Sequence, residues 1–200
     1  MSARFVHLRM HTEYSLSDGI VRVAPLMQKL RDLEMPAVAV TDQSNLFAMI
    51  KFYSAAERAG IKPIIGVDAW VQEETATAPS RLTLLCMNRD GYLNLTRLVT
   101  RSFLEGQERG RAQFQRDWLT SAATEGLIAL SGAREGDLGR LLLEGKTAEA
   151  SATLEFWRAR FGDRFYLEVQ RCGHAGEEDY LHEAVALAGS HGVPLVATND

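Results

Sequence analysis

The sequence is poor in cysteine and in long apolar runs. Its two cysteines, Cys86 and Cys172, are too few for a disulfide scaffold and favour a reducing compartment. No apolar run approaches the ~20 residues that span a bilayer, and the first ten residues lack the charged-then-apolar pattern of a secretory signal. We therefore expect a cytoplasmic protein with no membrane contact.

Excess positive charge is also missing. The net charge of −4 argues against a chain whose main task is to coat nucleic acid, although it leaves open a part of a larger nucleic-acid enzyme. Hydrophobic residues make up 46% and charged residues 24% of the 200 residues, which excludes a mostly disordered chain. One domain with one core suffices for this length.

Strand-like and helix-like segments alternate along the chain. We expect strands at 4–10, 37–40, 63–71, 81–87, 126–130, 165–169 and 194–198. We expect helices at 24–33, 45–59, 92–103, 138–143, 147–161 and 177–191. Such alternation is typical of repeated βα units with a parallel sheet. Seven strands favour a barrel over an open sheet, and the sequence leaves closure of the barrel open.

Three segments share the order of helix, break, proline, apolar strand and aspartate. They end at Asp42, Asp68 and Asp200. Because βα barrels place their chemistry at the carboxyl ends of the strands, we expect these carboxylates at one barrel mouth, together with His11 and Asp18. Either a divalent metal or a set of arginines must then neutralise them.

Each of these residues also has a plainer interpretation. A single aspartate after a strand usually caps a helix or forms a turn, and a lone histidine is more often a hydrogen-bonded core residue than a ligand. Only His7 and His11 of the five histidines lie near the expected mouth. A multinuclear phosphoesterase centre needs several histidines, so the supply is poor.

Seven segments carry a specific resemblance: HLRMHTEYSLSDG at 7–19, AVTDQSNLF at 39–47, GIKPIIG at 60–66, LTLL at 82–85, NRDGYLNL at 88–95, EGLIALSG at 125–132 and VATND at 196–200. In order and spacing they resemble the polymerase and histidinol phosphatase (PHP) domain, of the kind that begins the alpha subunit of bacterial DNA polymerase III. The resemblance covers essentially the whole chain. It implies one PHP domain over 1–200, folded as a distorted seven-stranded parallel (β/α)7 TIM-like barrel. The family domain normally runs on, so it also implies a barrel truncated at its C-terminal end.

The family's metal ligands fall on eight positions of this chain: Arg9, His11, Asp18, Gln43, Asp68, Arg81, Ala133 and Asp200. Four of these positions depart from the family pattern, with arginine, glutamine or alanine where metal-binding members have histidine or cysteine, and Asp68 stands for a glutamate. The resemblance therefore implies a degenerate site that cannot build a normal trinuclear centre, with no catalytic and no metal-binding residues.

The two arginines at these positions suggest what replaced the metals. Arg9 and Arg81 put permanently charged groups beside Asp18, Asp68 and Asp200. We expect bidentate hydrogen bonds between guanidinium and carboxylate, and repulsion of any divalent cation. The alternative is that both arginines point to solvent.

The resemblance also implies a function. The intact protein would be a DNA-directed DNA polymerase, a nucleotidyltransferase of DNA replication, whose magnesium-dependent catalytic domains follow these residues. The present domain would be a catalytically inactive module without a cofactor. It would support the rest of the alpha subunit and dock the proofreading exonuclease subunit, with DNA contacted only through the intact polymerase.

Two other functions stay open for the mouth. A metal-dependent phosphoesterase, such as a proofreading nuclease or a pyrophosphatase, would need histidine at positions 9, 43 and 81. A metal-free binder of sugar or phosphate would use Arg9 and Arg81.

One further stretch is locally basic. Segment 105–116 is expected to be a solvated loop. Its arginines, with Arg101, offer a contact for DNA or an acidic partner, but Glu105 and Glu108 interrupt the positive charge.

Overall fold

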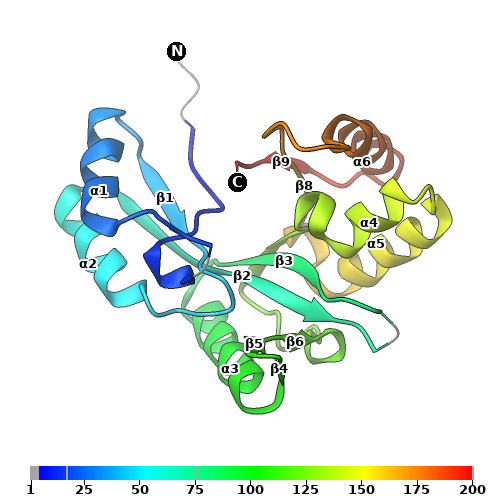
Figure 1. Cartoon of the computed structure of the whole chain (residues 1–200), viewed down its shortest axis with the longest axis horizontal. Coiled ribbons are helices and arrows are strands. Elements are labelled where there is room, and N and C mark those ends of the chain that lie inside the picture. The colour runs from blue at the N-terminus through cyan, green and yellow to red at the C-terminus, as the bar shows by residue number, and fades with distance from the viewer. Residues whose placement is uncertain (1–4, 17, 75, 200) are drawn as a thin grey trace.

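The computed structural model describes residues 5–16, 18–74 and 76–199 (Figure 1). Its centre is one curled sheet with the strand order β1-β2-β3-β7-β8-β9, and the short strand β6 (Phe114–Gln115) pairs with β2. The other strands are β1 Ala37–Val40, β2 Lys62–Gln72, β3 Ser80–Cys86, β7 Leu127–Leu130, β8 Phe165–Val169 and β9 Leu195–Ala197. These six lie within one residue of their predicted bounds, and the curled sheet forms half of a barrel.

The prediction of an all-parallel barrel is wrong at β3. The pairs β1–β2, β7–β8 and β8–β9 are parallel, but β3 runs antiparallel to both of its neighbours. The reason is the length of the connection, because the residues between Gln72, which ends β2, and Ser80, which begins β3, are too few for a crossover helix. The fold is therefore a mixed α/β half-barrel.

The prediction of a strand at 4–10 is also wrong for residues 5–10, which the structure describes. Residues 5–10 run beside β1 but form only an isolated bridge between His7 and Val38. The amides of Ala39 and Thr41 donate to the carbonyls of His7 and Met10, at 2.8 and 3.0 Å. Two such bonds fix the segment without building a regular ladder.

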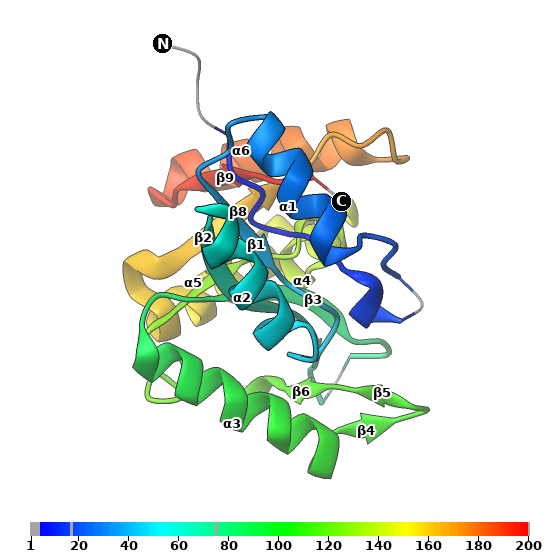
Figure 2. The same ribbon diagram turned by 90° about the vertical axis from the view of Figure 1, so that its left-hand side faces the viewer.

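Helices cover the outside of the sheet, and Figure 2 shows α1 and α2 in front of β1 and β2. Their bounds are α1 Val23–Asp32, α2 Met49–Ala59, α3 Arg89–Glu105, α4 Asp137–Leu143, α5 Thr147–Phe161 and α6 Glu177–His191. Helix α2 starts later than predicted, because the side chain of Asn45 stabilises a turn before it. The side-chain amide donates to the carbonyls of Tyr14 and Gln43, and Oδ1 accepts from the backbone amide of Phe47.

The core has two main parts. The larger lies between the sheet and helices α3 to α6, where the rings of Trp157 and Phe165 stack with centroids 6.2 Å apart and Phe161 packs beside them. The smaller joins α1 and α2 to β1, around Phe52 and Val38. Burial of each such side chain contributes roughly 1.5–3 kcal/mol, so these contacts hold the helices on the sheet.

The prediction that segment 105–116 is a solvated loop is wrong. Strands β4 (Gln107–Glu108) and β5 (Arg111–Ala112) form a hairpin, and Phe114 in β6 is fully buried. Arg109 and Gly110 both have positive φ, at 51° and 79°, which is the conformation of a tight two-residue hairpin turn.

None of the helices in the described part of the chain has both the length and the apolar character of a membrane-spanning segment.

Candidate functional site

The antiparallel course of β3 builds the site. In the β2–β3 register, Asp68 lies opposite Thr83 and Trp70 lies opposite Arg81. Because side chains alternate between the faces of a sheet, these four side chains share one face. Arg81 is thus a diagonal neighbour of Asp68 at the mouth, the open end of the half-barrel.

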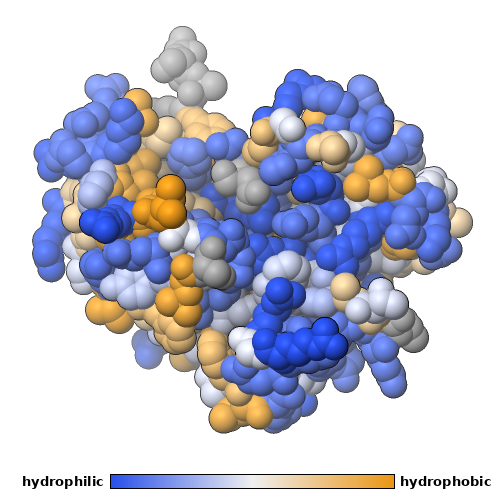
Figure 3. All heavy atoms as spheres, viewed as in Figure 1, coloured by the Kyte–Doolittle hydropathy of each residue, from blue (hydrophilic) through white to orange (hydrophobic). Residues whose placement is uncertain are grey.

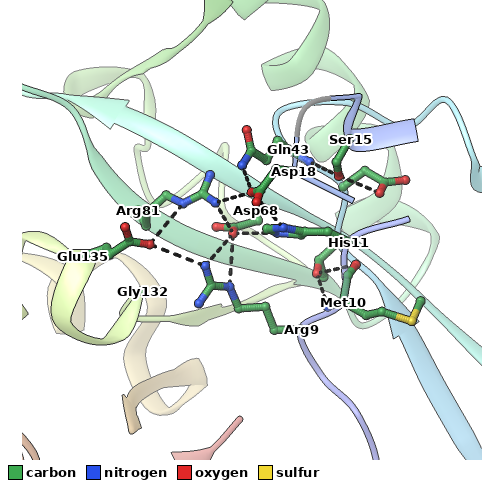
Figure 4. Close-up of polar contacts among 12 residues, drawn as sticks. Arg9, Met10, His11, Ser15, Asp18, Gln43, Asp68, Arg81, Gly132 and Glu135 are labelled. Atoms are coloured by element: carbon green, nitrogen blue, oxygen red, sulfur yellow. Dashed lines mark hydrogen bonds and ion pairs between the residues drawn. The ribbon is translucent and has the colours of Figure 1, made fainter. Parts of the chain in front are cut away.

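Asp68 is the centre of the mouth and is fully buried (Figure 4). Its Oδ2 lies 3.1 Å from both Nε and Nη2 of Arg9, 3.1 Å from Nη2 of Arg81 and 2.9 Å from Nε2 of His11. Burial opposes ionisation of Asp68, but Arg9, the hydrogen bond from His11 and Arg81 outweigh it and hold the pKa of this carboxyl well below its usual range.

Arginine–carboxylate pairing is therefore present at Asp68, but not in the predicted bidentate form. The contacts converge on Oδ2, whereas Oδ1 is buried and has no hydrogen-bond partner among the described residues. Nε and Nη1 of Arg81 and the hydroxyl of Thr83 are likewise buried without a hydrogen bond in that part of the chain. Both arginine side chains are almost fully buried, so the solvent-facing alternative does not apply.

Two half-exposed carboxylates line the rim. Asp18 lies 3.1 Å from Nδ1 of His11 and 3.4 Å from Nη2 of Arg81, and it accepts a hydrogen bond from the amide of Gln43. Glu135 lies 3.8 Å from a nitrogen of each arginine. Sequence reasoning placed Asp18 and Gln43 here but missed Glu135, which follows β7 in a short 3-10 turn (Ala133–Glu135).

The other expected members behave differently. The carbonyl of Asp42 accepts from the amide of Asp68 at 3.2 Å, but its buried carboxylate has other partners. It accepts from the amide and hydroxyl of Thr12 at 2.6 and 2.8 Å and from the hydroxyl of Ser15 at 2.8 Å. It shapes a turn, as the plainer interpretation had it. Ala133 is buried and brings no polar group, and Asp200 lies outside the described residues.

Glu168 is a buried carboxylic acid that sequence reasoning missed. Its carboxyl accepts from the amide of Gly132 at 3.0 Å and from the hydroxyl of Thr198 at 2.5 Å. Burial raises its pKa, and the charge of Arg9 only partly offsets this. A charged residue inside the apolar strand 165–169 was the signal that could have found it.

A cleft of about 410 Å³ opens beside the cluster. Its polar lining includes Arg9, His11 and Asp18, and its apolar lining includes Met10 and Ile20. The centre of this face of the molecule is hydrophilic in the space-filling view (Figure 3).

The donor set does not fit the metal centre that the resemblance implies. Two guanidinium groups contact Oδ2 of Asp68, so positive charge already lies beside this carboxylate. Across 5–16, 18–74 and 76–199, no group of three or more His, Cys, Asp or Glu side chains is arranged to hold a metal ion. The carboxylate at the centre of the mouth is thus engaged by cationic side chains of the chain itself.

Comparison with known proteins agrees with the fold. An amidohydrolase from Chromobacterium violaceum, solved with bound sulfate and no metal, superposes with a TM-score of 0.66 at 15% identity, over 99% of this chain and 87% of that one. A putative metal-dependent phosphoesterase from Bifidobacterium adolescentis gives a TM-score of 0.59 at 11% identity, over 96% and 85% of the two chains. At these identities the likeness concerns the fold alone.

Sequence relatives are much nearer. The chain is 54% identical to the DNA polymerase III subunit alpha of Pseudomonas aeruginosa over its whole length, and 47% identical to that of Escherichia coli K12 over 98% of its length. It spans 17% of each of these relatives and matches their N-terminal region. The PHP domain model matches residues 7–172. The chain therefore belongs to the PHP domain family, in the form found at the start of DNA polymerase III alpha subunits.

Proposed function

We propose that this chain is a catalytically inactive, metal-free structural module of a polymerase III alpha subunit in the cytoplasm. One observation carries the proposal: Arg9 and Arg81 each place a guanidinium nitrogen 3.1 Å from the same oxygen of Asp68. Arginine stays charged at every working pH, so these groups neutralise the carboxylate permanently and repel a divalent cation. In this proposal the mouth has a structural role and catalyses no reaction.

The test is hydrolysis of the chromogenic diester bis(p-nitrophenyl) phosphate with added manganese. We expect no turnover above that of buffer with manganese. Manganese-dependent turnover that disappears in Asp68→Asn would instead support the phosphoesterase alternative, because Asp68 is the buried carboxylate of the mouth.

Polymerase chemistry belongs to the rest of the protein in this proposal. The chain spans 17% of its relatives, which are named DNA polymerase III subunit alpha. We infer that DNA-directed nucleotidyl transfer, the magnesium it uses and the contacts with DNA lie in the remaining length. A primer-extension assay with this chain alone should give no nucleotide incorporation.

We propose further that the module packs against the rest of the alpha subunit and docks the proofreading exonuclease subunit. Support comes from large apolar side chains exposed near α2 and α3: Phe47, Ile50 and Leu104 are 59%, 70% and 78% exposed. The rings of Phe47 and Phe103 lie 6.0 Å apart, so the turn before α2 and helix α3 meet at this surface. Exposed apolar surface of this kind is typical of protein–protein contact.

A pull-down with the purified exonuclease subunit tests the docking. We expect the chain to capture the exonuclease. Failure of the folded chain to capture it would contradict docking by this module, and would leave the arrangement at Asp68 unaffected.

A further inference from the structure

A second cleft lies away from the mouth. It has a volume of about 690 Å³ and is formed by the end of β2, the short 3-10 helix Arg116–Trp118 and helix α5. Phe156 and Trp118 supply its apolar lining. None of the mouth residues lines it, so its role is independent of the function proposed above.

Arg116 at this cleft is paired with carboxylates, although its Nε is buried without a hydrogen-bond partner among the described residues. Its Nη1 lies 2.5 Å from the carboxylate of Glu73, and its Nη2 lies 4.0 Å from that of Asp137. The guanidinium also stacks over Phe156, 3.9 Å from the ring centroid. Arg116 therefore joins the end of β2 to helices α4 and α5, and its charge already faces two carboxylates of the chain.

Arg160 is not compensated. Its guanidinium lies 3.3 Å from the centroid of the same Phe156 ring, and Nη1 donates to the carbonyl of Phe156 at 3.1 Å. Within the described residues no carboxylate lies at ion-pair distance, and Nε is buried without a partner. Burial and the nearby positive charge of Arg116 both lower the pKa of Arg160, so its environment disfavours the cation.

The rim of the cleft carries negative charge. Glu74 and Asp117 are exposed and form no ion pair with the described residues. Together with Glu73, they give the lining one more negative than positive charge. A polyanion such as nucleic acid would be repelled by this net negative lining.

We propose that this cleft binds a polypeptide segment with mixed charge. A carboxylate of the segment pairs with Arg160, and a basic side chain faces Glu74 and Asp117. The volume lies within the range of specific ligand sites, and arginine beside aromatic rings is the composition of protein-interface hot spots.

The experiment uses the peptide Ac-Lys-Leu-Glu-Leu-Lys-NH2 and follows the Nε–Hε resonance of Arg160 in ¹H–¹⁵N spectra of the whole chain. We expect a saturable shift. The same peptide with glutamine in place of glutamate should bind about tenfold more weakly, because it lacks the charge-assisted hydrogen bond. Inorganic phosphate should give no saturable shift.

Two variants localise the binding. In the variants binding is followed by the indole Nε1–H resonance of Trp118, which lines the cleft. Arg160→Gln should weaken the peptide about tenfold, whereas Arg158→Gln, on the same helix but paired with Glu155 at 3.0 Å, should bind as the parent does. The proposal is overturned by no saturation up to about 10 mM peptide, by equal binding of the glutamine peptide, by a saturable response to phosphate, or by equal losses in both variants. The two peptides and phosphate decide the matter on the parent chain even if Arg160→Gln does not fold.

Discussion

Arg81 stacks on Trp70, its direct partner across the β2–β3 ladder, with the guanidinium carbon 4.1 Å from the ring centroid. The same guanidinium reaches Asp68 at 3.1 Å. Arg111 of the β4–β5 hairpin lies over the same indole at 4.4 Å. The indole thus aims Arg81 at the buried carboxylate and connects the hairpin to the mouth.

Removal of the charge at Asp68 should be strongly destabilising. Asp68→Asn leaves the buried Arg9 and Arg81 without their shared carboxylate, and we expect a loss of about 3–5 kcal/mol in the free energy of unfolding in urea. The control Asp18→Asn alters a half-exposed member of the same cluster and should cost less than about 1 kcal/mol. Equal losses in the two variants would mean that Asp68 is not the electrostatic centre.

The local pattern of the sequence was sufficient for most of the fold. Apolar periodicity located the main helices, and alanine- or valine-rich runs located β1 and β2, because both signals depend only on which face is buried. Strand direction does not depend on that pattern. The direction of β3 follows from the length of the loop at 73–79, a signal that was present and was outweighed by the βα repeat.

The contacts of the site could be predicted for residues whose type departs from the family pattern. For the other residues of the site they could be predicted less well. Arg9 and Arg81 stand at positions where charge must be neutralised, so their contact with Asp68 follows from electrostatics. Glu135 and Glu168 belong to no such pattern, because their places depend on how β7 and β8 approach the mouth. Asp42 looked equivalent to Asp68 in sequence, but hydroxyl and amide donors from Thr12 and Ser15 surround it.

Gly132 should tolerate no side chain. It has φ of 76°, and a Cβ there would clash with the carbonyl oxygen of Arg81. Gly145 has φ of 70° but open space around it. Both alanine variants bear the conformational cost of about 1 kcal/mol, so Gly132→Ala should lose at least about 1 kcal/mol more than Gly145→Ala in thermal or urea unfolding. A match between the two would show that the backbone contact with Arg81 is not tight.

Glu168 should make folding pH-dependent. Its pKa in the folded chain is raised above the ordinary value near 4.3. Its contribution to stability is therefore full below that value and is lost as pH rises through the raised pKa. The free energy of unfolding, measured as parent minus Glu168→Gln, should fall as the pH rises above about 4.3. A difference that stays constant or rises would contradict a raised pKa.

The proposed function requires that guanidinium groups neutralise Asp68 in place of metal ions. The most direct test is to measure how much metal the chain binds. The chain would be purified without chelators or an affinity tag, dialysed against buffer with zinc and manganese, desalted, and measured by inductively coupled plasma mass spectrometry. We expect metal far below one ion per chain, because Arg9 and Arg81 neutralise the carboxylate. Stoichiometric zinc or manganese that is lost in Asp68→Asn would contradict it.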